Sequence, residues 1–64
     1  MAELTLAQLV ERCYASNTEL KPHVKSMWRS PEPCEFGWHI EEATCNDGSV
    51  WEWIPEDHIW ELKR

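Results

Sequence analysis

The hydrophobic positions in the first quarter of the chain recur at the spacing of a helix. Thr5 and Gln8 have the spacing of a capping box, in which the threonine hydroxyl accepts a first-turn N–H and the glutamine bonds back to the threonine backbone. The pattern predicts a helix over residues 6–16 that packs on the rest of the fold, with docking of part of its apolar stripe into another protein as the alternative. The stripe consists of Leu6, Leu9, Val10, Cys13 and, at its margin, Tyr14.

Beyond this helix the pattern changes to that of β-strands. Residues 24–29 form a first expected strand, which the two prolines of residues 30–33 close because proline cannot donate to a strand ladder. In residues 36–40 every second side chain is apolar, which is the period of a half-buried strand. The alternation shifts phase at residues 41–42, and this shift predicts a β-bulge.

A turn signal divides the second half of the chain. Asparagine, aspartate and glycine at residues 46–48 tolerate the positive φ of tight turns, so residues 36–54 are expected to form a hairpin. In its second strand Trp51 and Trp53 should point to one face and the aliphatic residues to the other. Apolar groups on both faces predict that this strand is sandwiched.

Pro55 ends the strand because it fixes φ and has no N–H, and polar residues 56–58 return the chain. Residues 59–63 are open to two interpretations. Proline followed by acids, with Lys63 near the end, is typical of one or two helical turns, whereas β-branched and aromatic residues favour a strand. We expect the strand.

Five tryptophans are a large share of a 64-residue chain. Such a chain has room for one domain, residues 1–64, and a domain of this size buries only about 60% of the surface that its unfolded chain exposes. Each tryptophan can bury roughly 150–250 Å². Most of the tryptophans are therefore expected in the core, and the remainder are candidates for recognition.

Charge is unevenly distributed along the chain. The net charge is −6, and residues 32–64 hold nine of the twelve carboxylates. A negative face is not attracted to phosphate backbones or anionic membranes, so neither nucleic acid nor a membrane is expected as a direct partner. The one basic patch, from Lys21 to Arg29, is short and is interpreted as solvated charge. The expected partner is another protein with a basic or mixed apolar and basic surface.

The three cysteines are an odd number, and residues 1–3 lack the basic start of a secretory leader. No apolar run approaches the roughly 18 residues of a membrane helix. Reduced cysteines and a cytoplasmic location are therefore expected.

The sequence contains residue types suited to zinc binding and to catalysis. Cys34, His39, Cys45 and His58 are suitable zinc ligands in kind, but they lack the close pairing that structural sites use, so neither metal nor cofactor is predicted. A disulfide between Cys34 and Cys45 would require aligned strands and an oxidising compartment. A cysteine with His58 and Asp57 supplies the groups of a nucleophilic site, but so small a chain cannot enclose one and also bury a core. The sequence predicts that the protein is not an enzyme.

The second half of the chain resembles the C-terminal half of SH3 domains. The family pattern runs from a tryptophan near a strand start, through a hairpin, to aromatic-aliphatic-Pro-Ser-Asn-Tyr-Val, and here Trp38 and residues 53–59 take those places. The resemblance covers roughly residues 36–62 and implies a small SH3-like barrel. Together with the helix predicted above, the expected fold is α+β, with the N-terminal α-helix packed on a small antiparallel SH3-like β-barrel or sheet over residues 24–63. The resemblance also implies that Ile54 and Ile59 belong to the core. The side chains that it places in a shallow aromatic groove are Trp38, Trp53, Pro55 and His58.

These features favour a non-catalytic protein-binding module, acting as a small regulator or inhibitor of a larger complex. One alternative is that the acidic face imitates nucleic acid and occupies the basic channel of a nucleic-acid enzyme, as a phage or mobile-element inhibitor would. Another is that a tryptophan patch forms a homo-oligomer, and the sequence leaves the oligomeric state open. The expected anchors are Trp38, Trp53 and Trp60, with Glu52, Glu56, Asp57 and Glu61 attracting the basic partner.

Overall fold

The structure is a computed structural model, and it describes residues 4–64 of the chain. It contains helices and an antiparallel sheet, so the predicted α+β class is confirmed. In chain order the elements are α1 (Leu6–Arg12), β1 (Tyr14–Ala15), α2 (Asn17–Leu20), the 3₁₀ turn η1 (Lys21–His23), β2 (Val24–Arg29), β3 (Glu41–Cys45), β4 (Val50–Ile54) and β5 (Ile59–Leu62).

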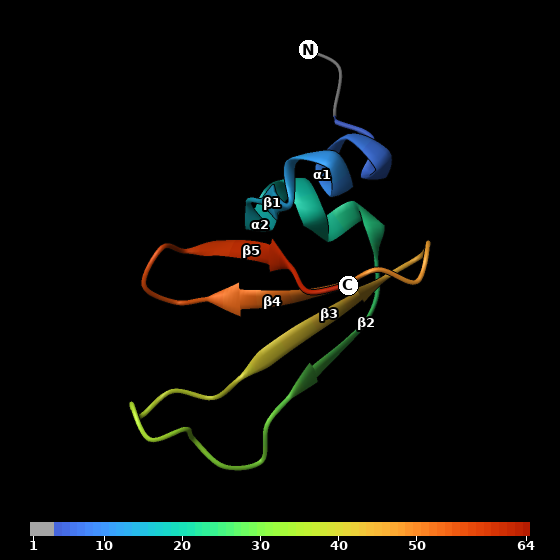
Figure 1. The fold of residues 1–64 in the computed structure, drawn as a ribbon. Coiled ribbons are helices and arrows are strands. Elements are labelled where there is room, and N and C mark those ends of the chain that lie inside the picture. The colour runs from blue at the N-terminus through green and yellow to red at the C-terminus, as the bar shows by residue number, and fades with distance from the viewer. Residues whose placement is uncertain (1–3) are drawn as a thin grey trace.

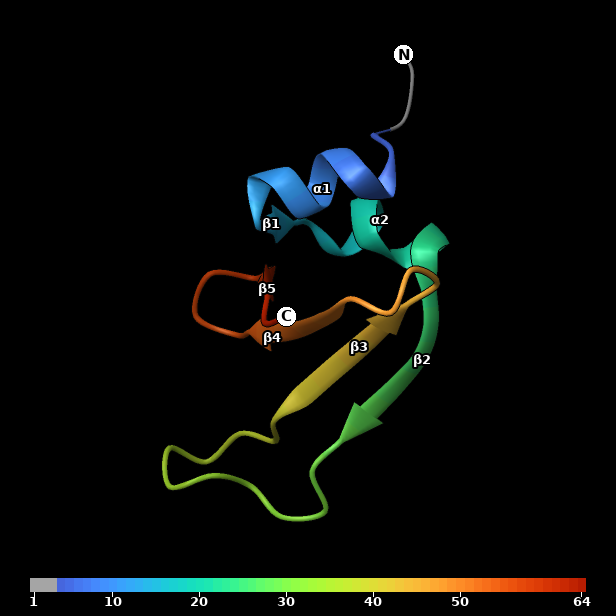
Figure 2. The same ribbon diagram turned by 45° about the vertical axis from the view of Figure 1, so that its right-hand side comes forward.

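The five strands form one sheet in the order β1-β5-β4-β3-β2. Strands β2 to β5 follow one another up and down, and β1 pairs with the far side of β5. Because β1 and β2 are the two edges, the sheet is open rather than closed into a barrel. The helices lie at one end of the molecule, and the loop of residues 30–40 lies at the other (Figures 1 and 2).

The predicted helix over residues 6–16 is wrong in its extent. The capping box of Thr5 and Gln8 forms as expected, but α1 ends at Arg12, and Cys13 adopts a left-handed φ of 65°. Ser16 then starts α2 with a second capping box, in which its side chain and that of Glu19 bond reciprocally to the backbone. Two start signals so close together cause the chain to form two short helices around β1.

The predicted strand over residues 36–40 is also wrong, since β3 begins only at Glu41. Residues 30–40 form a loop that is closed by its own backbone bonds. The N–H of Ser30 bonds to the Ile40 carbonyl at 2.8 Å, and a turn at Gly37, which has φ 94°, bonds back to Cys34 at 2.9 Å. A positive φ at Gly37 interrupts the extended backbone that the alternation predicted.

The bulge lies in β2 rather than at residues 41–42. The register between β2 and β3 shifts between Val24 and Ser26, which leaves Lys25 as the extra residue. An extra residue changes which side chains share a face. Val24 opposes Cys45 and Met27 opposes Ala43, so both β2 side chains lie on the same face of the sheet although they are three positions apart.

Several predictions are confirmed. Strand β2 coincides with residues 24–29, the turn over residues 46–48 joins β3 to β4, and residues 59–62 form a strand rather than a helix. Gly48 has φ 88° and donates its N–H to the Cys45 carbonyl at 2.9 Å. Pro55 opens the turn between β4 and β5, as its missing N–H predicts.

The core lies between the helices and one face of the sheet, which we call the helix-side face. Both buried tryptophans satisfy their indole N–H: Trp51 donates to Ser49 Oγ at 3.0 Å, and Trp60 donates to Asn17 Oδ1 at 3.2 Å. Among the described residues, the buried hydrophobic side chains are Leu9, Ala15, Leu20, Ala43, Cys45, Trp51 and Trp60.

Ile54 and Ile59 are not in this core, and that expectation is wrong. They oppose each other across β4 and β5 and are half-buried. Trp51 and Trp53 are two positions apart in β4, so both lie on the helix-side face. Ile54 follows Trp53 directly and therefore lies on the opposite face, here called the outer face. Within residues 4–64, the buried core lies on the helix-side face, so the expectation that β4 is sandwiched is not met on the outer face.

Candidate functional site

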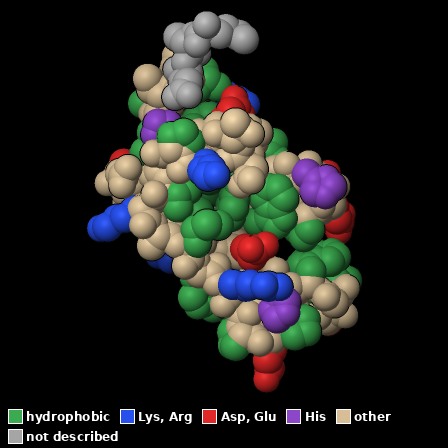
Figure 3. All heavy atoms as spheres, turned by 180° about the vertical axis from the view of Figure 1, so that it is seen from behind, with side chains coloured by type: hydrophobic (Ala, Val, Ile, Leu, Met, Phe, Trp, Pro, Cys, Tyr) green, Lys and Arg blue, Asp and Glu red, His purple; other side chains and the backbone are tan. Residues whose placement is uncertain are grey.

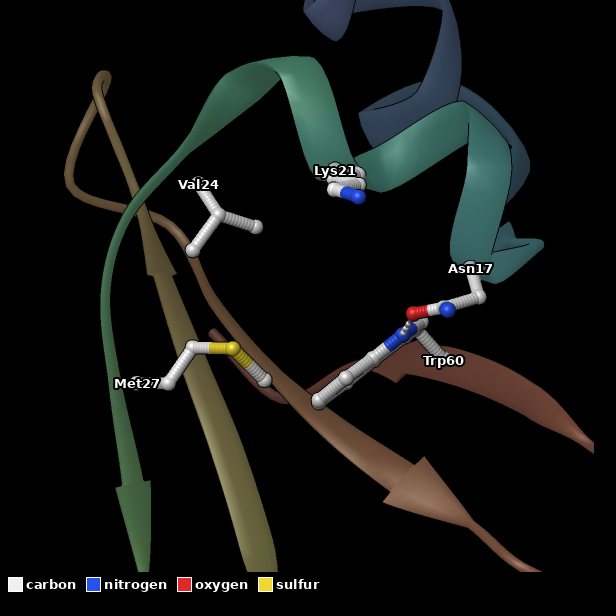
Figure 4. A pocket seen from close by; sticks show the side chains of 5 residues that line it. All are labelled: Asn17, Lys21, Val24, Met27 and Trp60. Carbon is white, nitrogen blue, oxygen red and sulfur yellow. Dashed lines mark hydrogen bonds between the residues drawn. The ribbon is translucent and has the colours of Figure 1, made fainter.

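The helices cover only part of the helix-side face, and a groove remains open between α2 and β2. Figure 4 shows Met27 reaching from β2 towards the ring of Trp60, with Asn17 bonded to the indole from α2. The bulge at Lys25 allows β2 to form one wall of the groove, because it places Val24 and Met27 on the same face of the sheet. The larger hollow of the groove has a volume of about 410 Å³ and is lined by Asn17, Lys21, Val24, Met27 and Trp60.

A smaller hollow of about 260 Å³ continues the groove. It shares Asn17, Met27 and Trp60 with the larger one and adds Glu41 and Trp53. Hydrophobic side chains gather at the centre of the face in Figure 3, with basic, acidic and histidine side chains around them. The groove lining therefore combines apolar side chains with the polar Asn17 and the charged Lys21 and Glu41.

Three of the residues expected at the site form a continuous aromatic strip. The ring centroids of Trp53 and Trp60 are 5.3 Å apart, and those of Trp53 and His58 are 6.2 Å apart. Trp53 and Trp60 oppose each other across β4 and β5, while His58 reaches Trp53 from the turn, where its own φ is 51°. The aromatic strip, defined as Trp60, Trp53 and His58, thus runs from the groove to the β4–β5 turn.

The turn itself carries three further expected residues, Pro55, Glu56 and Asp57. Pro55 is half-buried, whereas Glu56 and Asp57 are exposed. The Asp57 N–H bonds to the Ile54 carbonyl at 3.2 Å, which holds the turn closed. Two carboxylates therefore lie in the same turn as the histidine end of the aromatic strip.

Trp60 itself contributes little surface, because only 3% of it is exposed. It serves as the wall of the groove rather than as a projecting anchor.

Trp38 is separate from the aromatic strip. It lies half-buried in the loop of residues 30–40 and stacks on Phe36, with ring centroids 5.5 Å apart and planes 22° apart. Phe36 is 71% exposed. Of the side chains that the SH3 resemblance placed in one groove, the structure pairs Trp53 with His58 and pairs Trp38 with Phe36 instead.

Glu52 lies on the outer face, away from the groove. It opposes Glu42 on one side and Glu61 on the other, so three carboxylates form a row across β3, β4 and β5. The Lys63 ammonium donates to Glu42, and this bond, with the nearby charges, raises the pKa of Lys63 above its ordinary value. Glu52 is therefore part of an acidic row and not of the aromatic strip.

Cysteine chemistry gives no further site. Cys13, Cys34 and Cys45 are all free thiols, and burial raises the pKa of the Cys45 thiol above its ordinary value. Within residues 4–64, no three side chains among histidine, cysteine, aspartate and glutamate come together as a metal site would require. No helix in the same part of the chain is long and apolar enough to cross a membrane.

Of the groove residues, Trp53 and Trp60 are expected from the sequence, whereas Asn17, Lys21 and Met27 are not. Met27 and Trp28 are adjacent in β2 and are 60% and 53% exposed, on opposite faces of the strand. The available signal is a pair of large apolar residues between Lys25 and Arg29, in a segment that the sequence predicts as a strand but not as part of a site. Asn17 and Lys21 gave no local signal, because their role depends on how α2 folds over the sheet.

No protein-family model matches this chain, and no curated protein or solved structure matches it. The case for a function therefore depends on the geometry of the groove, the aromatic strip and the acidic row.

Proposed function

We propose that the chain is a non-catalytic protein-binding module, acting as a small regulator or inhibitor of a larger complex. The observation that carries this proposal is the uncovered part of the helix-side face. Met27 forms one wall of the groove and is 60% exposed, beside the half-buried Trp53. An exposed hollow with apolar and polar side chains is typical of an interaction surface, because exposed apolar area does not stabilise the fold of a single chain.

The aromatic strip and the adjoining turn support the same proposal. Tryptophan is over-represented among the residues that contribute most to binding, and Trp53 contributes a partly exposed ring that Trp60 and His58 hold in place. Glu56 and Asp57 in the turn would attract a basic partner and accelerate association.

The free edge of β2 offers a second element for the same surface. It is an edge strand, and all of its residues except Val24 are exposed. Edge strands accept extended segments of partner proteins through backbone hydrogen bonds. We take the SH3 likeness in this sense, as a small aromatic-lined β module, since His58 in place of the family's tyrosine directs the expectation away from proline-rich ligands. Three free cysteines support a reducing compartment such as the cytoplasm.

Two matched variants of β2 test the proposal. Met27→Glu places a carboxylate in the groove, whereas Trp28→Glu places the same charge on the outer face of the same strand. Both positions are more than half exposed, so both variants should stay folded, which circular dichroism checks. In affinity capture from cells of the source, Met27→Glu should lose the partners that the wild type and Trp28→Glu retain. Equal capture by the two variants would refute binding through this groove.

A second function is favoured by the acidic row of Glu42, Glu52 and Glu61. These carboxylates oppose one another on neighbouring strands, so they repeat at the strand spacing of roughly 5 Å. A regular row of negative charge is what imitation of a nucleic-acid backbone requires. Under this alternative, the Trp28→Glu variant would capture partners in low salt and would lose them steeply as the salt concentration rises. Binding through the apolar groove should instead tolerate salt.

A further inference from the structure

We propose that the larger hollow of the groove binds the carboxyl terminus of a partner polypeptide that ends in a bulky apolar residue. The inference deepens the protein-binding function proposed above and depends on it. It follows from a juxtaposition: three apolar side chains line the hollow together with two polar ones, and both polar side chains are hydrogen-bond donors. The apolar members are Val24, Met27 and Trp60, and the donors are Asn17 and Lys21.

The donor character of Asn17 follows from its bond to Trp60. An indole N–H can only donate, so the Asn17 atom that lies 3.2 Å from Trp60 Nε1 must be the amide oxygen. This fixes the orientation of the amide group. The Asn17 side chain makes no other hydrogen bond within residues 4–64, so its NH₂ group remains available as a donor.

Lys21 is the second donor, and it carries the only charge in the lining of the larger hollow. The ion pairs between described residues are Arg12 with Glu19 and Lys63 with Glu42, so the Lys21 ammonium is not neutralised by either. The chain has a net charge of −6, whereas the lining of this hollow carries a positive charge. Two donors, one of them cationic, are suited to an anionic acceptor such as a carboxylate.

The remaining lining selects an apolar group next to that anion. The volume of about 410 Å³ lies within the range of roughly 300–1,000 Å³ that binds small ligands. Met27 has an adaptable side chain, and the Trp60 ring forms a flat wall opposite it (Figure 4). A C-terminal residue carries a carboxylate and an apolar side chain on the same carbon, whereas aspartate and glutamate side chains lack the apolar part.

The smaller hollow indicates what precedes the terminal residue. Its lining adds Glu41 and Trp53, so it presents one carboxylate beside an aromatic ring. Arg29 opposes Glu41 across β2 and β3, but the ion pairs between described residues do not join them. A basic residue shortly before the terminus would therefore be attracted to Glu41, and an acidic one would be repelled. The preferred partner thus ends in a basic residue followed, within a few positions, by a bulky apolar residue with a free carboxylate.

The test is a titration followed by ¹⁵N-resolved NMR of the full chain. The probe is acetyl-Ala-Lys-Ala-Phe with a free carboxylate, and its C-terminal amide is the matched control. The acid should shift the Trp60 indole and Asn17 side-chain amide signals and bind at least about tenfold more tightly than the amide. Equal affinities, or shifts confined to other residues, would overturn the proposal.

A pair of lysine variants assigns the effect to the hollow. Lys21→Glu should weaken binding of the acid at least about tenfold, whereas Lys25→Glu, the same charge change at an exposed residue of the bulge, should change it no more than about twofold. Equal losses in both variants would show attraction to overall charge and would refute the site. If 3-phenylpropionate binds as tightly as the peptide, the hollow is a small-acid site and the polypeptide terminus is wrong.

The two proposals can fail separately. If the acid and amide peptides behave alike while Met27→Glu still abolishes capture, the carboxylate inference is wrong and the binding function stands. If Met27→Glu captures the same partners as the wild type, the binding function through the groove is itself refuted.

Discussion

At Cys13 the backbone adopts φ 65° to end α1, and its N–H bonds to the carbonyls of Leu9 and Val10. Glycine reaches this left-handed conformation without the steric cost that a side chain incurs, which is roughly 1 kcal/mol. Cys13 is exposed, so its side chain contributes little packing. Cys13→Gly should therefore raise the free energy of unfolding by about 0.5–1 kcal/mol, measured by urea denaturation under reducing conditions.

Cys13→Ala is the matched control for this change. Alanine removes the thiol but keeps the Cβ atom, so the backbone cost remains and no stabilisation is expected. If alanine stabilises as much as glycine, the thiol and not the backbone conformation is responsible.

The same conformation at His58 has a different consequence. His58 has φ 51° but also contacts the Trp53 ring, so a glycine there would relieve the backbone and lose part of the aromatic strip. A strained position that also carries a contact is typical of functional surfaces.

Among the elements, α1 and α2 are joined by an ion pair between Arg12 and Glu19 at 3.0 Å. Hydrogen bonds from Arg12 and from the Ser16 backbone lower the pKa of Glu19 from 4.5 to about 2. A carboxylate whose pKa is lowered on folding stabilises the fold above its unfolded pKa, and that contribution is lost as the pH falls through the folded pKa. The window for Glu19 is therefore pH 4.5 down to about 2.

Glu19→Gln tests this pH window. Glutamine can keep the capping bond to Ser16 but loses the charge, so the wild type should be the more stable at pH 6. The difference in urea midpoint should shrink as the pH falls from 4.5 towards 2, because Glu19 becomes neutral in the wild type. Arg12→Gln should abolish most of this pH-dependent difference, and a difference that persists unchanged at low pH would exclude the ion pair as its cause.

Elements with strong local signals were predictable from sequence. The turn over residues 46–48 requires a positive φ, which Gly48 supplies. The β-branched and aromatic residues of positions 59–62 favour a strand, and β5 forms there. The helix over residues 6–16 was predicted too long because the apolar period continues past Arg12. The second capping box, from Ser16 to Glu19, was present in the sequence and marks the correct boundary.

The groove could not be predicted in the same way. Val24 and Met27 share a face only because the bulge falls at Lys25, and this depends on the register between β2 and β3. The aromatic strip was predictable in part, since Trp53 and His58 are close in sequence, but its third member depends on the pairing of Trp53 with Trp60. Trp38 was misplaced because its stacking on Phe36 is a property of the loop.

At the scale of the whole molecule, the two faces of the sheet differ in burial and in charge. The helix-side face holds the core and a groove with one cation, whereas the outer face carries the row of Glu42, Glu52 and Glu61. Like charges that oppose each other across strands destabilise a sheet, and Lys63 offsets part of this repulsion through its bond to Glu42 and its attraction to Glu52.

Replacing the central member of the row measures this cost. Glu52→Lys converts two repulsive pairs, with Glu42 and Glu61, into attractive ones, at the loss of the attraction between Glu52 and Lys63. Because two pairs improve and one worsens, the free energy of unfolding should rise by about 0.5–1 kcal/mol at low salt. The gain should largely disappear in 1 M salt, where the screening length is only about 3 Å. Glu56→Lys makes the same change in net charge in the exposed β4–β5 turn and should give a much smaller gain. Equal gains from the two variants would mean that the overall charge of −6, rather than the row, limits stability.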